Sequence, residues 1–240
     1  MFQIITIRRY KNFIVIFGNL LYNKLITQKG GYIMQYNYLK GKSISFEGGE
    51  GSGKSTIIKM LSDFLEKQGL EVVQTREPGG SDIAEQIREV ILSKENTSMC
   101  AETECLLYAA SRAQLLREKV GPMLKQNKTI LYDRFVDSSY VYQGGCRGLG
   151  IDKVIEINEF ATKGFRPYKT FLLDIDPKIG LERIRVNNRE TNRLDEESLE
   201  FHYNVRKYYL EIAKRFPDRI VIIDANRTPE EIFEDVLNNL

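Results

Sequence analysis

Histidine and cysteine are scarce in this sequence of 240 residues, which has one histidine and three cysteines. A single histidine, His202, cannot supply a metal site built from several imidazoles, and we expect it to pack in a helix rather than to act in catalysis. The cysteines Cys100, Cys105 and Cys146 are odd in number and lack Cys-x-x-Cys spacing. Neither a disulfide framework nor a zinc site is therefore expected, and reduced thiols favour a cytoplasmic protein.

Acidic residues are absent before Glu47, although seven lysines and arginines occur there. The rest of the chain has 28 basic and 33 acidic side chains, a net charge of about −5. This balance argues against a nucleic-acid partner, because a general nucleic-acid surface needs a basic patch. The apolar run at residues 13–22 is too short for a membrane span, which needs ~20 residues, so no membrane association is expected.

The first 39 residues differ from the remainder, since they contain this apolar run and contribute to no motif described below. Met34 stands just before the remainder. Residues 1–39 are therefore predicted to be an N-terminal extension outside the core, either a translated upstream segment or a targeting peptide. Residues 40–240 are long enough for one α/β domain with a complete core.

From residue 43 onward, short apolar strands alternate with helical segments. Strands are predicted at 44–46, 71–75, 129–132, 169–174 and 219–223, and helices after the first strand, at about 82–92 and at about 101–124. Strands of this kind predict a parallel β-sheet of about five strands flanked by α-helices. Ligands of such sheets bind beyond the carboxyl ends of the strands.

A P-loop, FEGGEGSGKST at residues 46–56, directly follows the first predicted strand. Its glycines allow a tight turn whose backbone N–H groups surround phosphate oxygens, and the next helix adds its positive N-terminal end. Lys54 can reach the β- and γ-phosphates, and the Ser55 hydroxyl can ligate Mg²⁺. The chain is therefore predicted to bind a nucleoside triphosphate. The predicted binding residues are Gly48, Gly49, Glu50, Gly51, Ser52, Gly53, Lys54, Ser55 and Thr56.

Other polar residues fall at the same edge of the predicted sheet. Asp133 follows the third strand, where P-loop proteins place a carboxylate that holds Mg²⁺ or its water shell, and Arg134 beside it is available for a phosphate. Tyr108 and Arg112 are four residues apart on one predicted helix and share a face. An aromatic ring and a guanidinium so placed can stack on a base and hydrogen-bond its edge.

Five segments of the chain resemble the thymidylate kinase family: FEGGEGSGKST (46–56), TREPGG (75–80), YAASR (108–112), DRFVDSSYVYQGG (133–145) and NRLDEES (192–198). The resemblance implies the P-loop NTPase fold of a nucleoside monophosphate kinase, with an arginine-rich lid at about 183–195. It also implies ATP-dependent phosphorylation of dTMP to dTDP for dTTP synthesis, with Mg²⁺ as cofactor. Family members of this kind are homodimers, which we expect here by analogy.

The resemblance also implies roles for residues of a dTMP site. Arg88 and Arg134 are expected on the dTMP phosphate, and Tyr108 on thymine, where the family more commonly has Phe. Ser139 and Gln143 match readers of the base edge. Tyr142 matches an aromatic residue that crowds the sugar 2′ position, and Glu50 a carboxylate near the acceptor sugar. The implied dTMP-binding residues are Glu77, Arg88, Tyr108, Arg112, Arg134, Ser139, Tyr142 and Gln143.

Gly51 stands where eukaryote-like members of the family carry an arginine in the P-loop. Arginines instead crowd residues 183–195, which resembles the lid of bacterial-type members that brings arginine to the transferred phosphoryl group; the alternative is a solvated charged helix. The residues expected to act in catalysis are Lys54, Glu50, Arg134, Arg185, Arg189 and Arg193, with Ser55 and Asp133 at the metal.

Two other functions compete with this interpretation. One is a kinase for UMP, CMP or AMP, and the other is a GTPase-like switch or P-loop motor. The chain lacks an Asn-Lys-x-Asp guanine-reading motif and contains the complete acceptor set above, which favours the kinase.

Overall fold

The structure is a computed structural model that describes residues 7–10, 13–16, 36–186 and 197–240. Two units are distinguished, Met1–Gln35 and Tyr36–Leu240. In the first unit, β1 (Ile7–Tyr10) and β2 (Phe13–Ile16) pair as an antiparallel hairpin.

The second unit is the α/β domain, and it begins at Tyr36 rather than at residue 40. The reason is apolar packing: Tyr36 and Leu39 are buried in the same cluster as Ile44 and Leu65. The predicted boundary between residues 39 and 40 lies close to this division and stays a prediction. That the preceding residues form an extension outside the domain stays a prediction.

The sheet of this domain has five described strands in the order β4-β5-β3-β6-β7, and all neighbours are parallel. The strands are β3 (Ser43–Glu47), β4 (Val72–Arg76), β5 (Thr129–Asp133), β6 (Lys169–Asp174) and β7 (Ile220–Asp224). The predicted parallel sheet is confirmed, and each predicted strand agrees with the observed one to within about one residue at either end.

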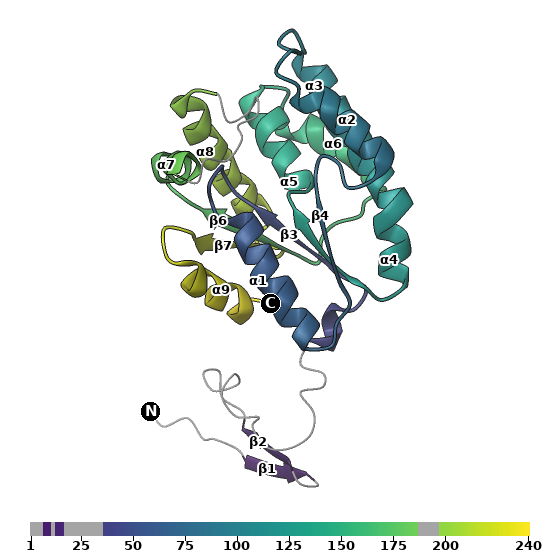
Figure 1. The fold of residues 1–240 in the computed structure, drawn as a ribbon, viewed down its shortest axis with the longest axis vertical. Helices are drawn as coiled ribbons and strands as arrows, with labels where there is room; N and C mark the ends of the chain where they lie inside the picture. The colour runs from purple at the N-terminus through teal and green to yellow at the C-terminus, as the bar shows by residue number, and fades with distance from the viewer. Residues whose placement is uncertain (1–6, 11–12, 17–35, 187–196) are drawn as a thin grey trace. The chain divides into compact units, whose positions relative to one another are not determined.

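Helices cover both faces of the sheet (Figure 1). The described helices of at least ten residues are α1 (Lys54–Lys67), α2 (Asp82–Leu92), α3 (Ala101–Leu115), α6 (Ile151–Thr162), α7 (Pro177–Val186), α8 (Leu199–Arg215) and α9 (Pro229–Asn238). Shorter helical segments are η1 (Asn37–Leu39), α4 (Gly121–Lys125), α5 (Val136–Ser139) and the π-helical η2 (Leu116–Val120) and η3 (Tyr140–Cys146). No helix in this part of the chain is long and apolar enough to cross a membrane.

The helix predicted at about 101–124 is observed as three consecutive pieces, α3, η2 and α4. The π-helical turn η2 stands just before Pro122, which lies at the start of α4. Proline has no backbone N–H, so the regular hydrogen-bond ladder cannot continue unchanged past it, and a local widening of the helix accommodates the gap.

Two apolar cores result from the alternation of side chains along the strands. Leu131 and Phe171 face α1 and α9, whereas their neighbours Ile130 and Leu172 face a second cluster built with α3, α6 and α8. A parallel strand buried on both faces needs apolar residues at consecutive positions, which is the pattern found in β5 and β6.

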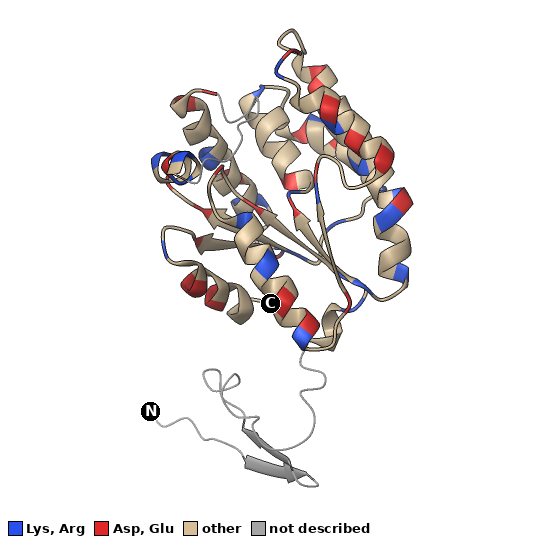
Figure 2. Cartoon of the chain, viewed as in Figure 1, with Lys and Arg blue, Asp and Glu red and all other residues tan. Residues whose placement is uncertain are grey.

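Charged residues stand at the ends of the strands, which are otherwise uncharged along their length (Figure 2). The last residues of the five strands are Glu47, Arg76, Asp133, Asp174 and Asp224. Because parallel strands end at one edge, the fold gathers these charges where ligands bind in such sheets.

Candidate active site

A cleft of about 610 Å³ lies at this carboxyl edge. Its volume is in the range of small-molecule sites. The P-loop from Glu50 to Thr56 lines it, together with the ends of β4 and β5 and side chains from α2, α3 and η3. Every residue predicted for the dTMP site lines the cleft, as do the predicted metal ligands Ser55 and Asp133. Gly48 and Gly49 of the predicted triphosphate site are not among its lining residues.

The Lys54 side chain folds back over its own loop. Its Nζ donates to the carbonyl oxygens of Gly48 (3.1 Å) and Gly49 (3.0 Å) and to the Ser52 hydroxyl (3.2 Å). Burial and the nearby Arg134 lower the pKa of Lys54 to about 8, although Asp133 and Glu50 act in the opposite direction. The ammonium is held at the centre of the loop, where phosphate oxygens would replace the backbone carbonyls.

We expect the affinity for ATP to fall as the pH rises through about 8, because the free protein then loses the Lys54 proton that the phosphates require. Above that pH the Kd should increase by up to about tenfold per pH unit. Calorimetric titrations with ATP from about pH 7 to about pH 10 would measure this change. The Lys54→Met variant should bind weakly with little pH dependence. A native Kd that stays constant to about pH 9 would contradict the assignment.

Ser55 and Asp133 meet beside the start of α1, where the Ser55 hydroxyl donates to Asp133 Oδ2 at 2.9 Å. A hydroxyl and a carboxylate are hard oxygen donors of the kind that Mg²⁺ takes, with water and substrate phosphates completing its coordination. The chemistry of this pair therefore fits a magnesium ion. The pairing arises because β3, which leads into the P-loop, lies next to β5, which ends at Asp133.

The partly buried Arg134 and the buried Glu50 form an ion pair next to this position. Arg134 has a positive φ of 70°, and its Nη2 donates to Glu50 Oε1 at 2.9 Å. The Tyr142 hydroxyl donates to the same oxygen at 2.8 Å. Burial would raise the pKa of Glu50, but Arg134, His202, Lys54 and Tyr142 together hold it well below its usual range. Glu50 is thus a carboxylate that stays charged inside the cleft.

His202 lies on a helix, α8, as expected, and its buried side chain also contacts the P-loop carboxylate. Its Nδ1 is 3.4 Å from Glu50 Oε2. The sequence pattern contained no signal for this contact. Glu50 and His202 are far apart in the chain, and the sequence of α8 shows only the period of an amphipathic helix.

Glu47 is a site residue that sequence reasoning missed. It ends β3 and accepts hydrogen bonds from the Phe135 backbone N–H (2.7 Å), the Ser138 hydroxyl (2.6 Å) and the Tyr209 hydroxyl (2.9 Å). Burial, with Asp137 nearby, raises the pKa of Glu47 to about 7. These bonds hold the turn that carries Asp133 and Arg134 into the cleft. The available signal was an acidic residue at the end of an apolar strand.

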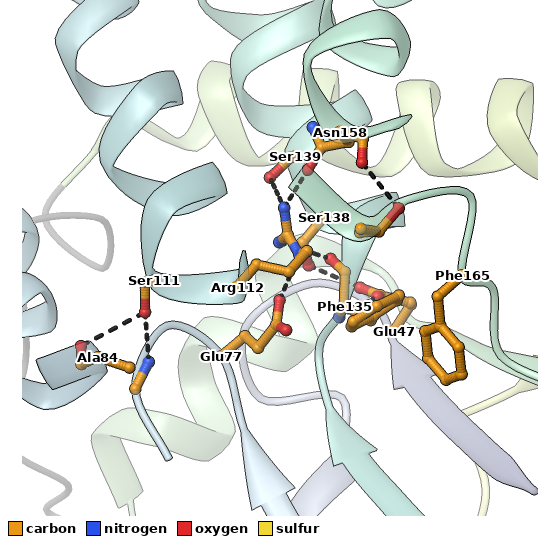
Figure 3. Close-up of polar contacts among 12 residues, drawn as sticks. Glu47, Glu77, Ala84, Ser111, Arg112, Phe135, Ser138, Ser139, Asn158 and Phe165 are labelled. Atoms are coloured by element: carbon orange, nitrogen blue, oxygen red, sulfur yellow. Dashed lines mark hydrogen bonds and ion pairs between the residues drawn. The ribbon is translucent and has the colours of Figure 1, made fainter. Parts of the chain in front are cut away.

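Arg112 is fully buried, at 1% exposure, in a polar network that joins four segments (Figure 3). Its Nε donates to Glu77 Oε2 at 2.6 Å, its Nη1 to the Ser139 hydroxyl at 3.2 Å and to Asn158 Oδ1, and its Nη2 to the Phe135 carbonyl at 3.3 Å. Burial raises the pKa of Glu77 to about 7, although Arg112 opposes the rise. The guanidinium is therefore fixed in orientation where it lines the cleft.

The loop after β4 is anchored to the neighbouring helices. Arg88 of α2 donates from Nη1 to the Pro78 carbonyl at 2.7 Å, and the Gly79 backbone N–H donates to the Ser111 hydroxyl at 3.0 Å. Burial lowers the pKa of Arg88, as does the nearby Arg76. Arg88 and Tyr108 line the same cleft.

The predicted lid lies only partly within the described residues. Arg183 of α7 lines the cleft and donates to the Ala225 carbonyl at 3.1 Å. Arg185 pairs with Glu182 at 2.7 Å, is 79% exposed and does not line the cleft. Arg189 and Arg193 lie outside the described residues.

Gly51 is required by the approach of α7 to the P-loop. Its φ is +70°, and a Cβ added there would lie 2.0 Å from the Gly180 carbonyl oxygen. A Cβ on Gly180 would in turn lie 2.2 Å from the Glu50 carbonyl oxygen. No side chain fits at Gly51 while α7 occupies this place, which gives a steric reason for the missing P-loop arginine.

The sequence profile of the thymidylate kinase family matches residues 46–236. A thymidylate kinase of Geobacillus sp. (strain WCH70) is 57% identical over 196 residues, which cover 81% of this chain and 93% of the relative. One from Clostridium novyi (strain NT) is 52% identical over 198 residues, covering 82% of this chain and 97% of the relative. The crystal structure of thymidylate kinase from Ehrlichia chaffeensis superposes with a TM-score of 0.68 at 27% identity, covering 83% of this chain and 98% of that one.

These matches extend over the P-loop, the strand ends and the helices that line the cleft. The extent and level of identity, together with the parallel five-stranded sheet, confirm the resemblance seen in the sequence. The chain belongs to the thymidylate kinase family.

Proposed function

We propose that this protein transfers the γ-phosphoryl group of ATP to dTMP and produces ADP and dTDP for dTTP synthesis. The observation that carries the proposal is that one cleft is lined by the P-loop, by Asp133 and Arg134, and by the residues that we assign to a nucleotide base. A phosphate donor at one end and a nucleotide acceptor at the other would meet at these two residues.

At the donor end, we assign the backbone N–H groups of the P-loop and the Lys54 ammonium to the phosphates of ATP. Ser55 and Asp133 would hold Mg²⁺, which supplies charge neutralisation on the phosphates when bound. The oxygen donors of this pair and their place at the start of α1 support the assignment. Lys54 would leave its backbone carbonyl partners and bind the phosphate oxygens.

At the acceptor end, we assign Arg88 and Arg134 to the dTMP phosphate and Tyr108 to one face of thymine. Arg112, Ser139 and Gln143 would face the base edge, since all three line the cleft and are buried. The network around Arg112 supports this role, because a site whose polar groups are already oriented binds with less loss of conformational freedom.

Transfer would be in line and without a covalent intermediate, because phosphoryl transfer needs mainly positioning and charge stabilisation. The acceptor oxygen belongs to a phosphate that is already ionised, so no strong general base is required. Glu50 supports this arrangement indirectly: its charge fixes Arg134, which would otherwise be free to turn away from the acceptor phosphate. We assign the lid arginines Arg185, Arg189 and Arg193 to the transferred phosphoryl group, which stays a prediction.

Acceptor specificity tests the proposal. We expect kcat/KM to be about 10- to 200-fold higher for dTMP than for dUMP, since one methyl group contributes that much in an apolar pocket. UMP should be much poorer still, because we assign Tyr142 to the sugar 2′ position, and its hydrogen bond to Glu50 would hold the ring there. ADP release from ATP would be measured with dTMP, dUMP, UMP, CMP, AMP and no acceptor.

Tyr142→Ala should narrow the difference in kcat/KM between dUMP and UMP. Tyr142→Phe keeps the ring but loses the hydrogen bond to Glu50, so it should retain more of this difference than Tyr142→Ala. Equal use of UMP and dTMP by the native protein would refute the thymidylate assignment. Release of ADP at the same rate without any acceptor would instead indicate a P-loop switch or motor.

We further propose a homodimer in the cytoplasm. Large apolar side chains are exposed on α2, α3 and α6, namely Ile83, Val90, Leu106 and Phe160, the last at 89%. An exposed apolar surface of this kind supports an association between copies of the chain. The dimer and its location stay predictions.

A further inference from the structure

We propose that Glu104 is a positioning residue that fixes the Gln143 amide, so that the cleft accepts a base with an N–H donor at ring position 3, such as thymine, and rejects cytosine. This inference rests on the proposed function, since it concerns how the same site chooses its nucleotide. Neither the family resemblance nor the sequence motifs pointed to Glu104.

The Gln143 amide is held at one end only. Gln143 is buried, at 1% exposure, and lines the cleft. Its Nε2 donates to Glu104 Oε1 at 2.9 Å. Its carbonyl oxygen, Oε1, is buried and has no hydrogen-bond partner within the described part of the chain. A buried acceptor without a partner is costly, which indicates that a ligand donor completes it.

Glu104 determines which end of the amide is turned away from it. Glu104 is 2% exposed, and its Oε1 lies 3.4 Å from Arg147 Nε, so a positive charge stands beside the carboxylate. Arg147 is itself held by Glu197, at 2.8 Å from its Nη2. A carboxylate only accepts hydrogen bonds, so the amide must present its NH₂ group to Glu104 and its oxygen to the other side. The ion pair thus sets the orientation that a free glutamine amide would leave open.

The resulting polarity of the site matches thymine. The Gln143 oxygen is an acceptor, and the Arg112 guanidinium is a donor that cannot change its character. Thymine offers an N–H at ring position 3 between two carbonyl oxygens, so donors and acceptors are complementary. Cytosine offers a lone pair at position 3 and an amino group at position 4, so acceptor would face acceptor and donor would face donor. Unpaired buried polar groups of this kind discriminate strongly between analogues.

The test measures kcat/KM for dTMP and dCMP in the native protein and in Glu104→Gln. A glutamine at 104 can donate as well as accept, so the Gln143 amide can turn over. We expect the preference for dTMP over dCMP to fall by about 10- to 100-fold, mainly through a higher KM for dTMP with kcat nearly unchanged. Glu102→Gln, at an exposed position on the same helix α3, is the matched control and should behave as the native protein.

Glu104→Asp separates positioning from a merely structural role, because it keeps an acceptor-only carboxylate. We expect it to retain more of the dTMP preference than Glu104→Gln. A structural role would lower the use of both nucleotides alike and leave their ratio unchanged. Melting temperatures with and without dTMP would show that each variant is folded.

A probe on the native chain needs no variant. A dTMP methylated at ring position 3 has no N–H there, and we expect it to bind about 100-fold more weakly than dTMP. Equal binding of the methylated nucleotide, or an unchanged dTMP-to-dCMP ratio in folded Glu104→Gln, would overturn the inference. If the native protein does not phosphorylate dTMP at all, the proposed function fails instead.

Discussion

Replacing Lys54 with alanine is expected to lower kcat by about 10³-fold or more, the upper range for removing a single group that stabilises transition-state charge. Among the residues that the structure describes, Lys54 is the only lysine that lines the cleft. Its ammonium is already at the centre of the P-loop, bonded to Gly48, Gly49 and Ser52. Single-turnover measurements of phosphoryl transfer from ATP to dTMP would give the effect on the chemical step directly.

The fold should survive this substitution. Lys54 lies at the first position of α1, and alanine is a good helix former. The control is Lys59→Ala on the same helix, where the lysine is 71% exposed and pairs with Asp63. That variant should keep native kcat. A folded Lys54→Ala protein with native turnover would show that the P-loop does not carry out the transfer assigned to it.

Replacing Arg112 with leucine is expected to destabilise the domain by about 3–5 kcal/mol, because it leaves the buried Glu77 without its ion-pair partner. For a domain of this size, the melting temperature should fall by roughly 6–20 °C. Thermal and denaturant unfolding would measure the loss. Arg117→Leu, an exposed arginine shortly after Arg112, is the control and should change stability little.

The pH dependence of this loss identifies its cause. The pKa of Glu77 is raised to about 7 in the folded protein, above its value of 4.5 in an unfolded chain. The folded state therefore holds the proton more tightly, so stability from this group is present below pH 4.5 and is lost as the pH rises through about 7. Without Arg112 the pKa of Glu77 should rise further. The loss of stability in Arg112→Leu should therefore be larger at about pH 8 than at about pH 5.

Adding Glu77→Gln to Arg112→Leu should recover part of the stability and remove most of this pH dependence, since no buried carboxylate remains to be ionised. If Arg112→Leu loses the same stability at both pH values, or if the double variant is no more stable than the single one, Arg112 acts through Ser139 and Asn158 rather than through the ion pair.

Local sequence patterns were sufficient for the elements and for much of the cleft. The P-loop spacing from Gly48 to Ser55 sets a turn and a helix start that depend on nearby residues only. Strands such as 169–174 are recognisable because burial on both faces favours a nearly continuous apolar run without charged residues between the ends. Since all strands of a parallel sheet end at one edge, the position of Asp133 and Arg134 beside the P-loop could also be predicted from the sequence.

The way these residues are held depends on contacts between segments that are far apart in the sequence. The contacts of Glu50 with His202, and of Gln143 with Glu104, join segments that come together through crossovers between distant strands, and no local period records them. The burial of Arg112 was also invisible, because a charged residue on a helix is usually solvated unless its partners are supplied from elsewhere. Gly51 is the clearest case. The sequence shows that no arginine stands at this position, but the reason is the backbone of Gly180, which packs against Gly51 only in the folded chain.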